Sequence, residues 1–208
     1  MAIVVVGGHS RNIGKTSVVA GIIAALPQYN WTAFKVTQFG HGICSADSEP
    51  CHCETDAHTV AVTEERNATS GTDSARYLQA GAVHSFWVRT RQGQLADAMP
   101  RIRKELAKAE NVILESNSIL RFLQPDLYLT VLDFSVADFK PSAQYFLDRA
   151  DAVLFASGGN ATAPLWSPAL LQLVRGKPRF PIEPPTYVTS SVVAFVIEHL
   201  TITRQAMD

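Results

Sequence analysis

The chain has 208 residues, of which 47% are hydrophobic and 18% are charged, which suits one α/β domain with a hydrophobic core over residues 1–208. This composition excludes a disordered chain, and the net charge of −1 gives no reason to expect nucleic acid or an anionic membrane as the main partner. No apolar run reaches membrane-spanning length and the N-terminus has no basic segment of a signal peptide, so we expect a cytoplasmic protein.

Strands and helices are predicted to alternate along the chain. Short apolar runs between turn residues predict strands at 2–6, 31–37, 59–63, 83–90, 111–115, 127–133 and 151–156. Longer runs with helical spacing predict helices at 18–26, 73–80, 95–106, 141–149, 168–174 and 190–200. Pro100 should kink its helix or mark the true start. This alternation predicts a three-layer α/β/α fold with a mostly parallel sheet.

A glycine-rich loop follows the first strand and precedes the first helix. Residues 7–17 read Gly-Gly-His-Ser-Arg-Asn-Ile-Gly-Lys-Thr-Ser, and the strand, loop, Gly-Lys-Thr and helix order is typical of a phosphate-binding loop. Backbone N–H groups of such a loop bind phosphate oxygens, the lysine contacts the β- and γ-phosphates, and the threonine hydroxyl binds Mg²⁺. The predicted nucleotide-binding residues are Gly8, His9, Ser10, Arg11, Asn12, Ile13, Gly14, Lys15, Thr16 and Ser17.

The spacing of this loop differs from the usual one. A glycine normally stands five residues before Gly14, where this chain has His9, and Gly8 lies one residue earlier. Either the loop is one residue longer, or His9 takes a positive φ, which histidine adopts more readily than most residues.

Two acidic residues are candidates for the metal and the reacting water. Glu115 ends an apolar strand, where phosphate-loop enzymes place the acid that holds the Mg²⁺ shell or orients water. Asp73 starts a predicted helix, where the helix dipole alone would also favour an acid. We predict catalytic roles for Lys15, Asp73 and Glu115.

The stretch 71–82 reads Gly-Thr-Asp-Ser-Ala-Arg-Tyr-Leu-Gln-Ala-Gly-Ala. Together with the phosphate loop and Glu115, it resembles the MobB-type family, the nucleotide-binding adaptors of molybdopterin-guanine dinucleotide biosynthesis in molybdenum cofactor formation. The resemblance implies a P-loop NTPase fold, a GTP-binding protein and a homodimer. It also implies that Gly14, Lys15 and Thr16 bind phosphate and Mg²⁺, and that Asp73 and Glu115 serve the metal and water.

The segment 38–58 is too long and polar for an ordinary connection, and we interpret it as an insertion. It contains all three cysteines, Cys44, Cys51 and Cys53, together with His41, His52 and His58. In a reducing compartment, this grouping favours a soft metal, most simply zinc, with copper or an iron–sulfur centre as alternatives from the same donors. The other interpretation is a polar loop with reduced cysteines.

These patterns predict an Mg²⁺-dependent protein that binds GTP or ATP and hydrolyses it slowly. Three alternatives stay open. The first is a metal-insertion NTPase that acts on a metalloenzyme partner through the cysteine segment. The second is an adaptor that binds nucleotide but hardly hydrolyses it, and the third is an ATP-dependent enzyme related to dethiobiotin synthetase. In the last case the substrate would lie near the carboxyl end of the Glu115 strand. Residues 157–160, where relatives contact the base, read as a plain turn.

Overall fold

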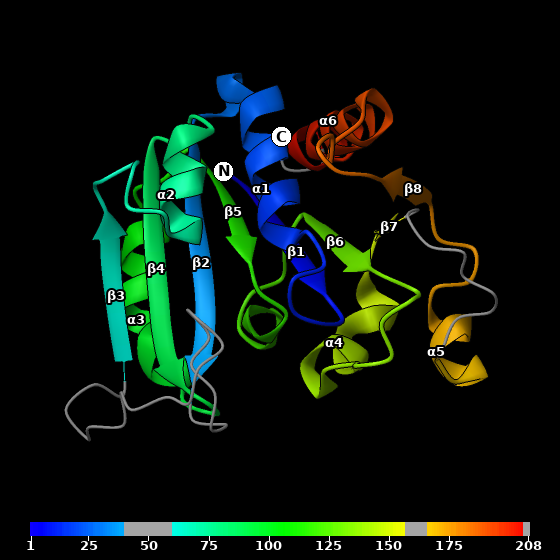
Figure 1. Ribbon diagram of the computed structural model, residues 1–208. Coiled ribbons are helices and arrows are strands. Elements are labelled where there is room, and N and C mark those ends of the chain that lie inside the picture. Colours follow the sequence, from blue (N-terminus) through cyan, green and yellow to red (C-terminus); the bar gives the residue numbers. More distant parts are fainter. Residues whose placement is uncertain (40–59, 157–165, 206–208) are drawn as a thin grey trace.

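The computed structural model describes residues 1–39, 60–156 and 166–205. Within these ranges the chain forms an eight-stranded sheet with helices on both faces (Figure 1). The strands are β1 (Ala2–Gly8), β2 (Trp31–Phe39), β3 (Val60–Glu65), β4 (His84–Arg91), β5 (Asn111–Glu115), β6 (Leu127–Leu132), β7 (Ala152–Ala156) and β8 (Arg179–Ile182). The helices are α1 (Lys15–Ala25), α2 (Asp73–Gln79), α3 (Leu95–Leu106), α4 (Pro141–Phe146), α5 (Pro168–Leu173) and α6 (Ser190–Gln205). Short 3-10 helices are η1 (Pro27–Tyr29), η3 (Ser118–Arg121) and η4 (Leu147–Arg149).

The strand order is β3-β4-β2-β5-β1-β6-β7-β8, and every neighbouring pair is parallel except β3 and β4. The carboxyl ends of β1, β2 and β5 meet at one edge of the sheet, because Glu115 pairs with both Val6 and Lys35. In a parallel α/β sheet this edge is where ligands bind. The predicted α/β class and parallel sheet are therefore confirmed.

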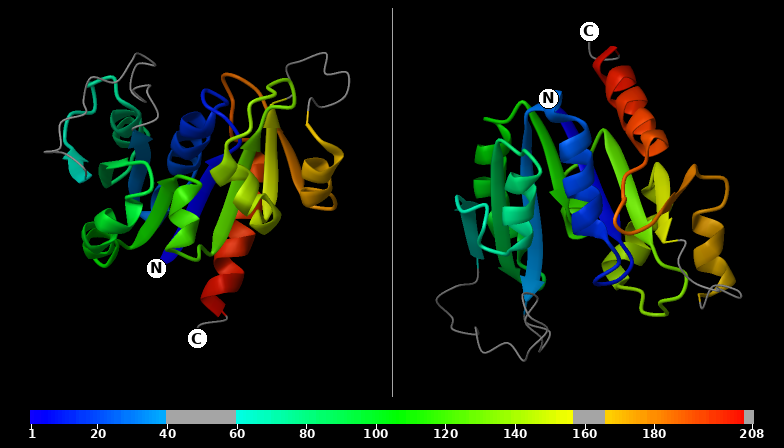
Figure 2. Two further views of the ribbon diagram at one scale, coloured as in Figure 1. Left: turned by 90° about the horizontal axis from the view of Figure 1, so that it is seen from below. Right: turned by 45° about the horizontal axis from the view of Figure 1, so that its top comes forward.

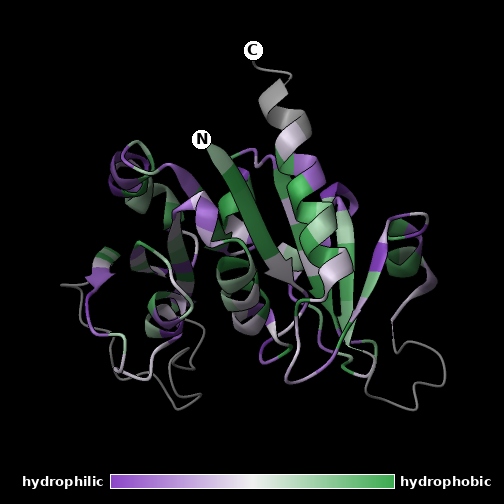
Figure 3. Cartoon of the chain, turned by 90° about the horizontal axis from the view of Figure 1, so that it is seen from above, coloured by the Kyte–Doolittle hydropathy of each residue, from purple (hydrophilic) through white to green (hydrophobic). Residues whose placement is uncertain are grey.

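Each face of the sheet has its own hydrophobic core, because successive residues of a buried strand point to opposite faces. Val4 and Val6 of β1 belong to the cluster that contains the apolar residues of α1 and α6, whereas Val5 belongs to the cluster that contains those of α3. The two groups of helices lie on opposite faces of the sheet (Figures 1 and 2). β1, which starts at the N-terminus, is hydrophobic along most of its length, and α6 carries both hydrophobic and hydrophilic residues (Figure 3).

Most predicted elements are confirmed, with three differences. α3 begins at Leu95 and contains Pro100, so the proline does not mark the helix start. The helix predicted at 141–149 is α4 followed by the 3-10 helix η4. β8 is not among the predicted strands, because Pro181 weakens its sequence signal. As an edge strand, β8 tolerates the missing N–H of this proline.

Among the described residues, no helix combines the length and the apolar character needed to cross a lipid bilayer. Residues 38 and 39 of the predicted insertion belong to β2, and residues 40–58, with all its cysteines and histidines, lie outside the described residues, as do residues 157–160.

Candidate functional site

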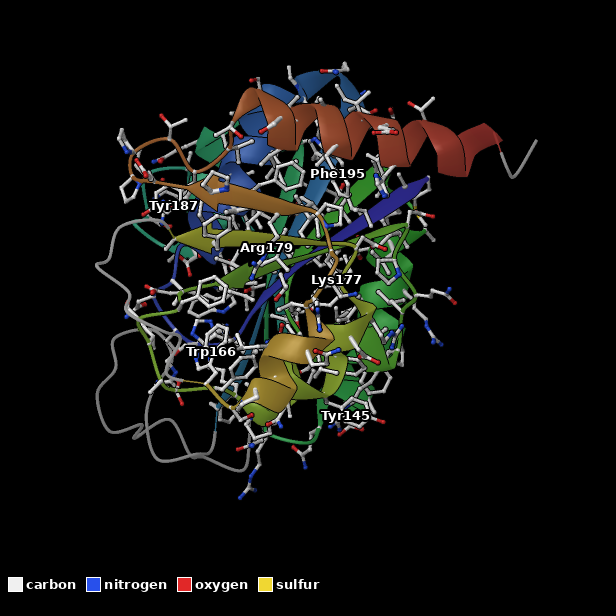
Figure 4. The ribbon with its side chains drawn as sticks, turned by 90° about the vertical axis from the view of Figure 1, so that its right-hand side faces the viewer. Tyr145, Trp166, Lys177, Arg179, Tyr187 and Phe195 are labelled. Atoms are coloured by element: carbon white, nitrogen blue, oxygen red, sulfur yellow. The ribbon has the colours of Figure 1, made fainter. Side chains whose placement is uncertain are left out.

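The glycine-rich loop connects β1 to the first turn of α1 at the carboxyl edge of the sheet (Figure 1). Gly14 caps α1 with a φ of 93°, a conformation that favours glycine, and its carbonyl accepts a hydrogen bond from Val18 N–H at 2.9 Å. A Cβ at Gly14 would lie 2.6 Å from the Tyr187 ring, so only glycine fits beneath that side chain. Figure 4 labels Tyr187 in the segment between β8 and α6. The sequence therefore folds as the predicted strand, loop and helix.

The longer loop is the alternative that the structure supports. His9 is not among the residues with positive φ, so the alternative of a glycine-like His9 is wrong. Gly8 instead takes the role of the first glycine, because the aliphatic stem of Lys15 passes over it, with Cδ 2.8 Å from where a Cβ would stand. Asn117 holds Gly8 from the other side. It accepts a hydrogen bond from Gly8 N–H at 2.9 Å and donates one to the Gly8 carbonyl at 2.8 Å.

The His9 side chain is fully buried in an aromatic cluster beside the loop. Its ring centroid lies 5.2 Å from that of Phe139 and 4.8 Å from that of Trp166, and its backbone N–H donates to the Val131 carbonyl at 3.3 Å. Figure 4 labels Trp166 just before α5. Burial lowers the pKa of His9 below its ordinary value of 6.5. The histidine thus anchors the loop as a neutral, packed side chain.

We expect the folded protein to lose stability as the pH falls below 6.5, and His9 to contribute to that loss. The folded pKa of His9 is lowered, so the unfolded chain takes up a proton near pH 6.5 that the folded chain binds only at lower pH. For each pH unit below 6.5, His9 lowers the free energy of unfolding by at most about 1.4 kcal/mol. Urea unfolding at pH 7.5 and 5.5 should therefore show a smaller pH effect for His9→Leu than for the wild type.

The matched control is His84→Leu, whose half-exposed ring lies 3.0 Å from Glu64 and packs outside this cluster. An equal pH effect in the wild type and His9→Leu would contradict the neutral, buried state of His9.

Lys15 extends from the first residue of α1 back across the loop. Its ammonium donates to the Ser10 carbonyl at 2.5 Å, and burial lowers the pKa of Lys15 to about 8, with the positive charges of Lys140 and Lys35 adding to this effect. The negative charges of Glu115 and Asp73 raise the pKa of Lys15 but do not outweigh burial. A buried ammonium with no direct carboxylate partner is costly, and a bound anion would relieve that cost.

A charged cluster lies next to Lys15, at the ends of β2 and β5. The Lys35 ammonium lies 2.6 Å from Asp73 Oδ2, 2.6 Å from Glu115 Oε1 and 3.2 Å from Thr16 Oγ1. The Thr16 hydroxyl donates to Glu115 Oε2 at 2.8 Å. The structure thus brings the predicted residues Thr16, Asp73 and Glu115 around one cation. Their proximity depends on the sheet, because Lys35 and Glu115 are register partners.

The charges in this cluster stabilise one another. Burial disfavours the Glu115 carboxylate, of which 4% is exposed, but the Lys35 and Lys15 ammonium groups outweigh this and hold the pKa of Glu115 below its usual value. Burial likewise disfavours the Lys35 charge, yet Glu115 and Asp73 raise the pKa of Lys35. The Tyr77 hydroxyl of α2 donates a hydrogen bond to Glu115, and burial raises the pKa of Tyr77, so it stays a neutral donor. Glu115 is therefore ionised and held in position.

The oxygen atoms of this cluster fit Mg²⁺. They are a threonine hydroxyl and two carboxylates, which are hard donors, and they already surround one positive charge. Mg²⁺ in phosphate sites is bound by one or two carboxylates, waters and phosphate oxygens, and not by a full protein cage. The described residues contain no group of three or more His, Cys, Asp or Glu that could hold a metal ion.

Sequence reasoning missed Lys35 and Tyr77. Lys35 is the one charged residue of β2, which is a sequence signal. Its carboxylate partners stand 38 and 80 positions away in the chain, and only the sheet brings them together. Arg76 lies in the 71–82 motif but has no predicted role of its own. In the structure its guanidinium donates a hydrogen bond to the Ser17 hydroxyl at 2.9 Å. The metal-binding role predicted for the cysteines and histidines of 41–58 stays a prediction, because these residues lie outside the described ranges.

The loop and the cluster open into one cleft of about 850 Å³. Its charged lining is positive, with six basic side chains and three acidic ones: Arg11, Lys15, Lys35, Arg76, Arg121 and Lys140, against Asp73, Glu115 and Asp138. The cleft continues past the loop along Val36–Gln38 and along Ser116–Phe122. A cleft with this charge is suited to a polyanion.

The fold, with its glycine loop at the carboxyl edge of a parallel sheet, is that of the P-loop NTPases. LpxK from Aquifex aeolicus, a structure in complex with ATP, matches with a TM-score of 0.50 and 19% identity over 87% of this chain; the chain spans 53% of the length of LpxK. HypB from Helicobacter pylori, in complex with nickel, matches with a TM-score of 0.48 and 13% identity, covering 95% of this chain and 86% of HypB.

Bacillus subtilis MobB matches with a TM-score of 0.43 and 14% identity, covering 96% of this chain and 98% of MobB. No protein-family model matches the chain, and no curated protein matches it significantly. The comparisons support the fold alone, and the MobB-type assignment stays a prediction.

Proposed function

We propose that the chain binds a purine nucleoside triphosphate with Mg²⁺ in this cleft and slowly hydrolyses its terminal phosphate. The observation that carries the proposal is the convergence of Thr16, Asp73 and Glu115 on the Lys35 ammonium, directly beside the loop that Gly14 and Lys15 form. Phosphate loops of this kind cradle the phosphate chain, and strand-end acids organise the metal and water.

The residues have separate roles in this proposal. The loop N–H groups and Lys15 bind the phosphates, and Thr16, Asp73 and Glu115 hold Mg²⁺, which would neutralise charge on the phosphate oxygens. Glu115 orients the attacking water, since its carboxylate is ionised and fixed by the Tyr77 hydroxyl. Lys35 positions both carboxylates and adds a second ammonium beside the reacting phosphate.

The test is calorimetric titration of ATP and GTP into the purified chain, with and without Mg²⁺, followed by measurement of phosphate release. We expect micromolar binding of at least one nucleotide that weakens when Mg²⁺ is omitted, and slow turnover. An absence of binding of either nucleotide at about 1 mM, a weak-affinity limit, would remove the proposal. The paired titrations also decide between GTP and ATP.

For the specific biological role, we propose that the chain is a MobB-type adaptor of molybdenum cofactor biosynthesis that acts as a homodimer. The support is the 71–82 motif, in which Asp73, Arg76 and Tyr77 all contact residues of the site. Light scattering with and without nucleotide tests the dimer. Elemental analysis of chelator-free protein beside a variant with Cys44, Cys51 and Cys53 changed to Ser tests the proposed zinc.

One observation favours a second candidate, an ATP-dependent enzyme with a small-molecule substrate. The cleft continues beyond the phosphate loop toward Ser116–Phe122, at the carboxyl end of β5, which leaves room for a second molecule. The two candidates differ in turnover. An adaptor would hydrolyse nucleotide slowly whatever small molecules are added, whereas an enzyme would release ADP rapidly only when its substrate is present.

A further inference from the structure

A third lysine faces the cleft from the segment that joins β6 to α4. This segment is bound to the glycine loop at several points. The Lys140 N–H donates to the His9 carbonyl at 2.8 Å, and the Ser10 hydroxyl donates to Asp138 Oδ2 at 2.7 Å. The backbone of Lys140 is thereby held against the beginning of the loop, and its side chain lines the cleft.

The charge of Lys140 differs from those of the other two lysines. Lys35 has two carboxylate partners, and Lys15 donates to the Ser10 carbonyl. The Lys140 ammonium has no hydrogen bond or ion pair with any residue in the described ranges. Burial lowers the pKa of Lys140, and the positive charges of Arg11 and Lys35 add to this effect, whereas the Asp138 and Glu115 carboxylates oppose it without reversing it. A half-buried cation beside other cations is unfavourable unless an anion binds there.

The position of Lys140 indicates which part of a bound nucleotide it would contact. Its side chain lines the same cleft as Lys15, Lys35 and Glu115, and its charge interacts with theirs. In P-loop proteins the metal-binding acids lie beside the terminal phosphates, so Lys140 is on the same side as those phosphates.

We propose that Lys140 is a phosphate-binding residue that contacts the terminal phosphate and makes the site prefer nucleoside triphosphates to diphosphates. The inference rests on the proposed function, because it requires a nucleotide in the cleft. A charge-assisted contact of an ammonium with phosphate in a partly buried site strengthens binding by about tenfold to a hundredfold.

The experiment measures the affinities of ATP, ADP, GTP, GDP and inorganic tripolyphosphate in the presence of Mg²⁺. The variants are Lys140→Met, which keeps the aliphatic stem, and Lys140→Arg, which keeps the charge. Lys104→Met is the matched control, since Lys104 is exposed on α3 and does not line the cleft. Thermal unfolding without nucleotide shows that each variant folds.

We expect Lys140→Met to weaken triphosphate and tripolyphosphate binding by about tenfold or more, and diphosphate binding by less than about threefold. Lys140→Arg should restore most of the loss, and Lys104→Met should leave all affinities unchanged. Equal weakening of triphosphate and diphosphate, or none for either, overturns the inference. If Lys15→Ala weakens triphosphate binding by about tenfold or more while Lys140→Met has no effect, the proposed function stands without Lys140. If neither variant changes binding, the proposed function fails as well.

Discussion

Lys15→Ala is expected to weaken the binding of Mg²⁺-bound ATP or GTP by about tenfold to 150-fold. The change removes a charge-assisted contact with phosphate, which contributes about 1.5–3 kcal/mol. The loss should be at the upper end, because the Lys15 ammonium is buried and the cleft holds no other partner for it than the Ser10 carbonyl among the described residues. Calorimetric titration of the nucleotides into wild type and variant measures the effect.

A control variant and a stability measurement accompany this titration. Lys108→Ala removes an exposed lysine that pairs with Glu105, so it should bind nucleotide as the wild type does. The nucleotide-free Lys15→Ala protein should unfold at a temperature close to that of the wild type, because losing a buried ammonium offsets the lost packing of its stem on Gly8. Wild-type affinity in a folded Lys15→Ala variant would remove the phosphate-loop assignment.

Glu115→Gln is expected to lower the turnover number by about a hundredfold or more while the nucleotide affinity changes by less than about threefold. Glutamine has the shape of glutamate but lacks the negative charge that would hold Mg²⁺ and orient water. Asp73→Asn should act in the same direction but less strongly, because 41% of the Asp73 side chain is exposed against 4% for Glu115, and water screens an exposed charge. Phosphate release under single-turnover conditions measures both.

The control for these variants is Glu110→Gln, an exposed glutamate just before the amino end of β5 that accepts a hydrogen bond from Asn30. It should hydrolyse nucleotide at the wild-type rate. Circular dichroism and thermal unfolding should show that Glu115→Gln folds, since Lys35 keeps Asp73 as a partner. Wild-type rates in both Glu115→Gln and Asp73→Asn would contradict the roles that the MobB-type resemblance implies for them.

The sequence by itself determined the elements and the loop, because these depend on residues close together in the chain. Consecutive apolar residues make β1 a buried strand, and the Gly-Lys-Thr sequence at its end predicts the loop. The acid at the end of β5 could be predicted for the same reason, since Glu115 directly follows a buried run. β8 could not, because Pro181 interrupts the local pattern that marks a strand.

Only the tertiary structure decided which residues surround the loop. Lys35 donates a hydrogen bond to Glu115, 80 positions away in the sequence, and Ser10 donates one to Asp138, 128 positions away. No local periodicity encodes such pairs. The same holds for Gly8, whose role as the first glycine depends on the Lys15 stem above it and on Asn117 beside it. The register of β2 against β5 is set by hydrophobic packing on both faces of the sheet, and this register brings Lys35 level with Glu115.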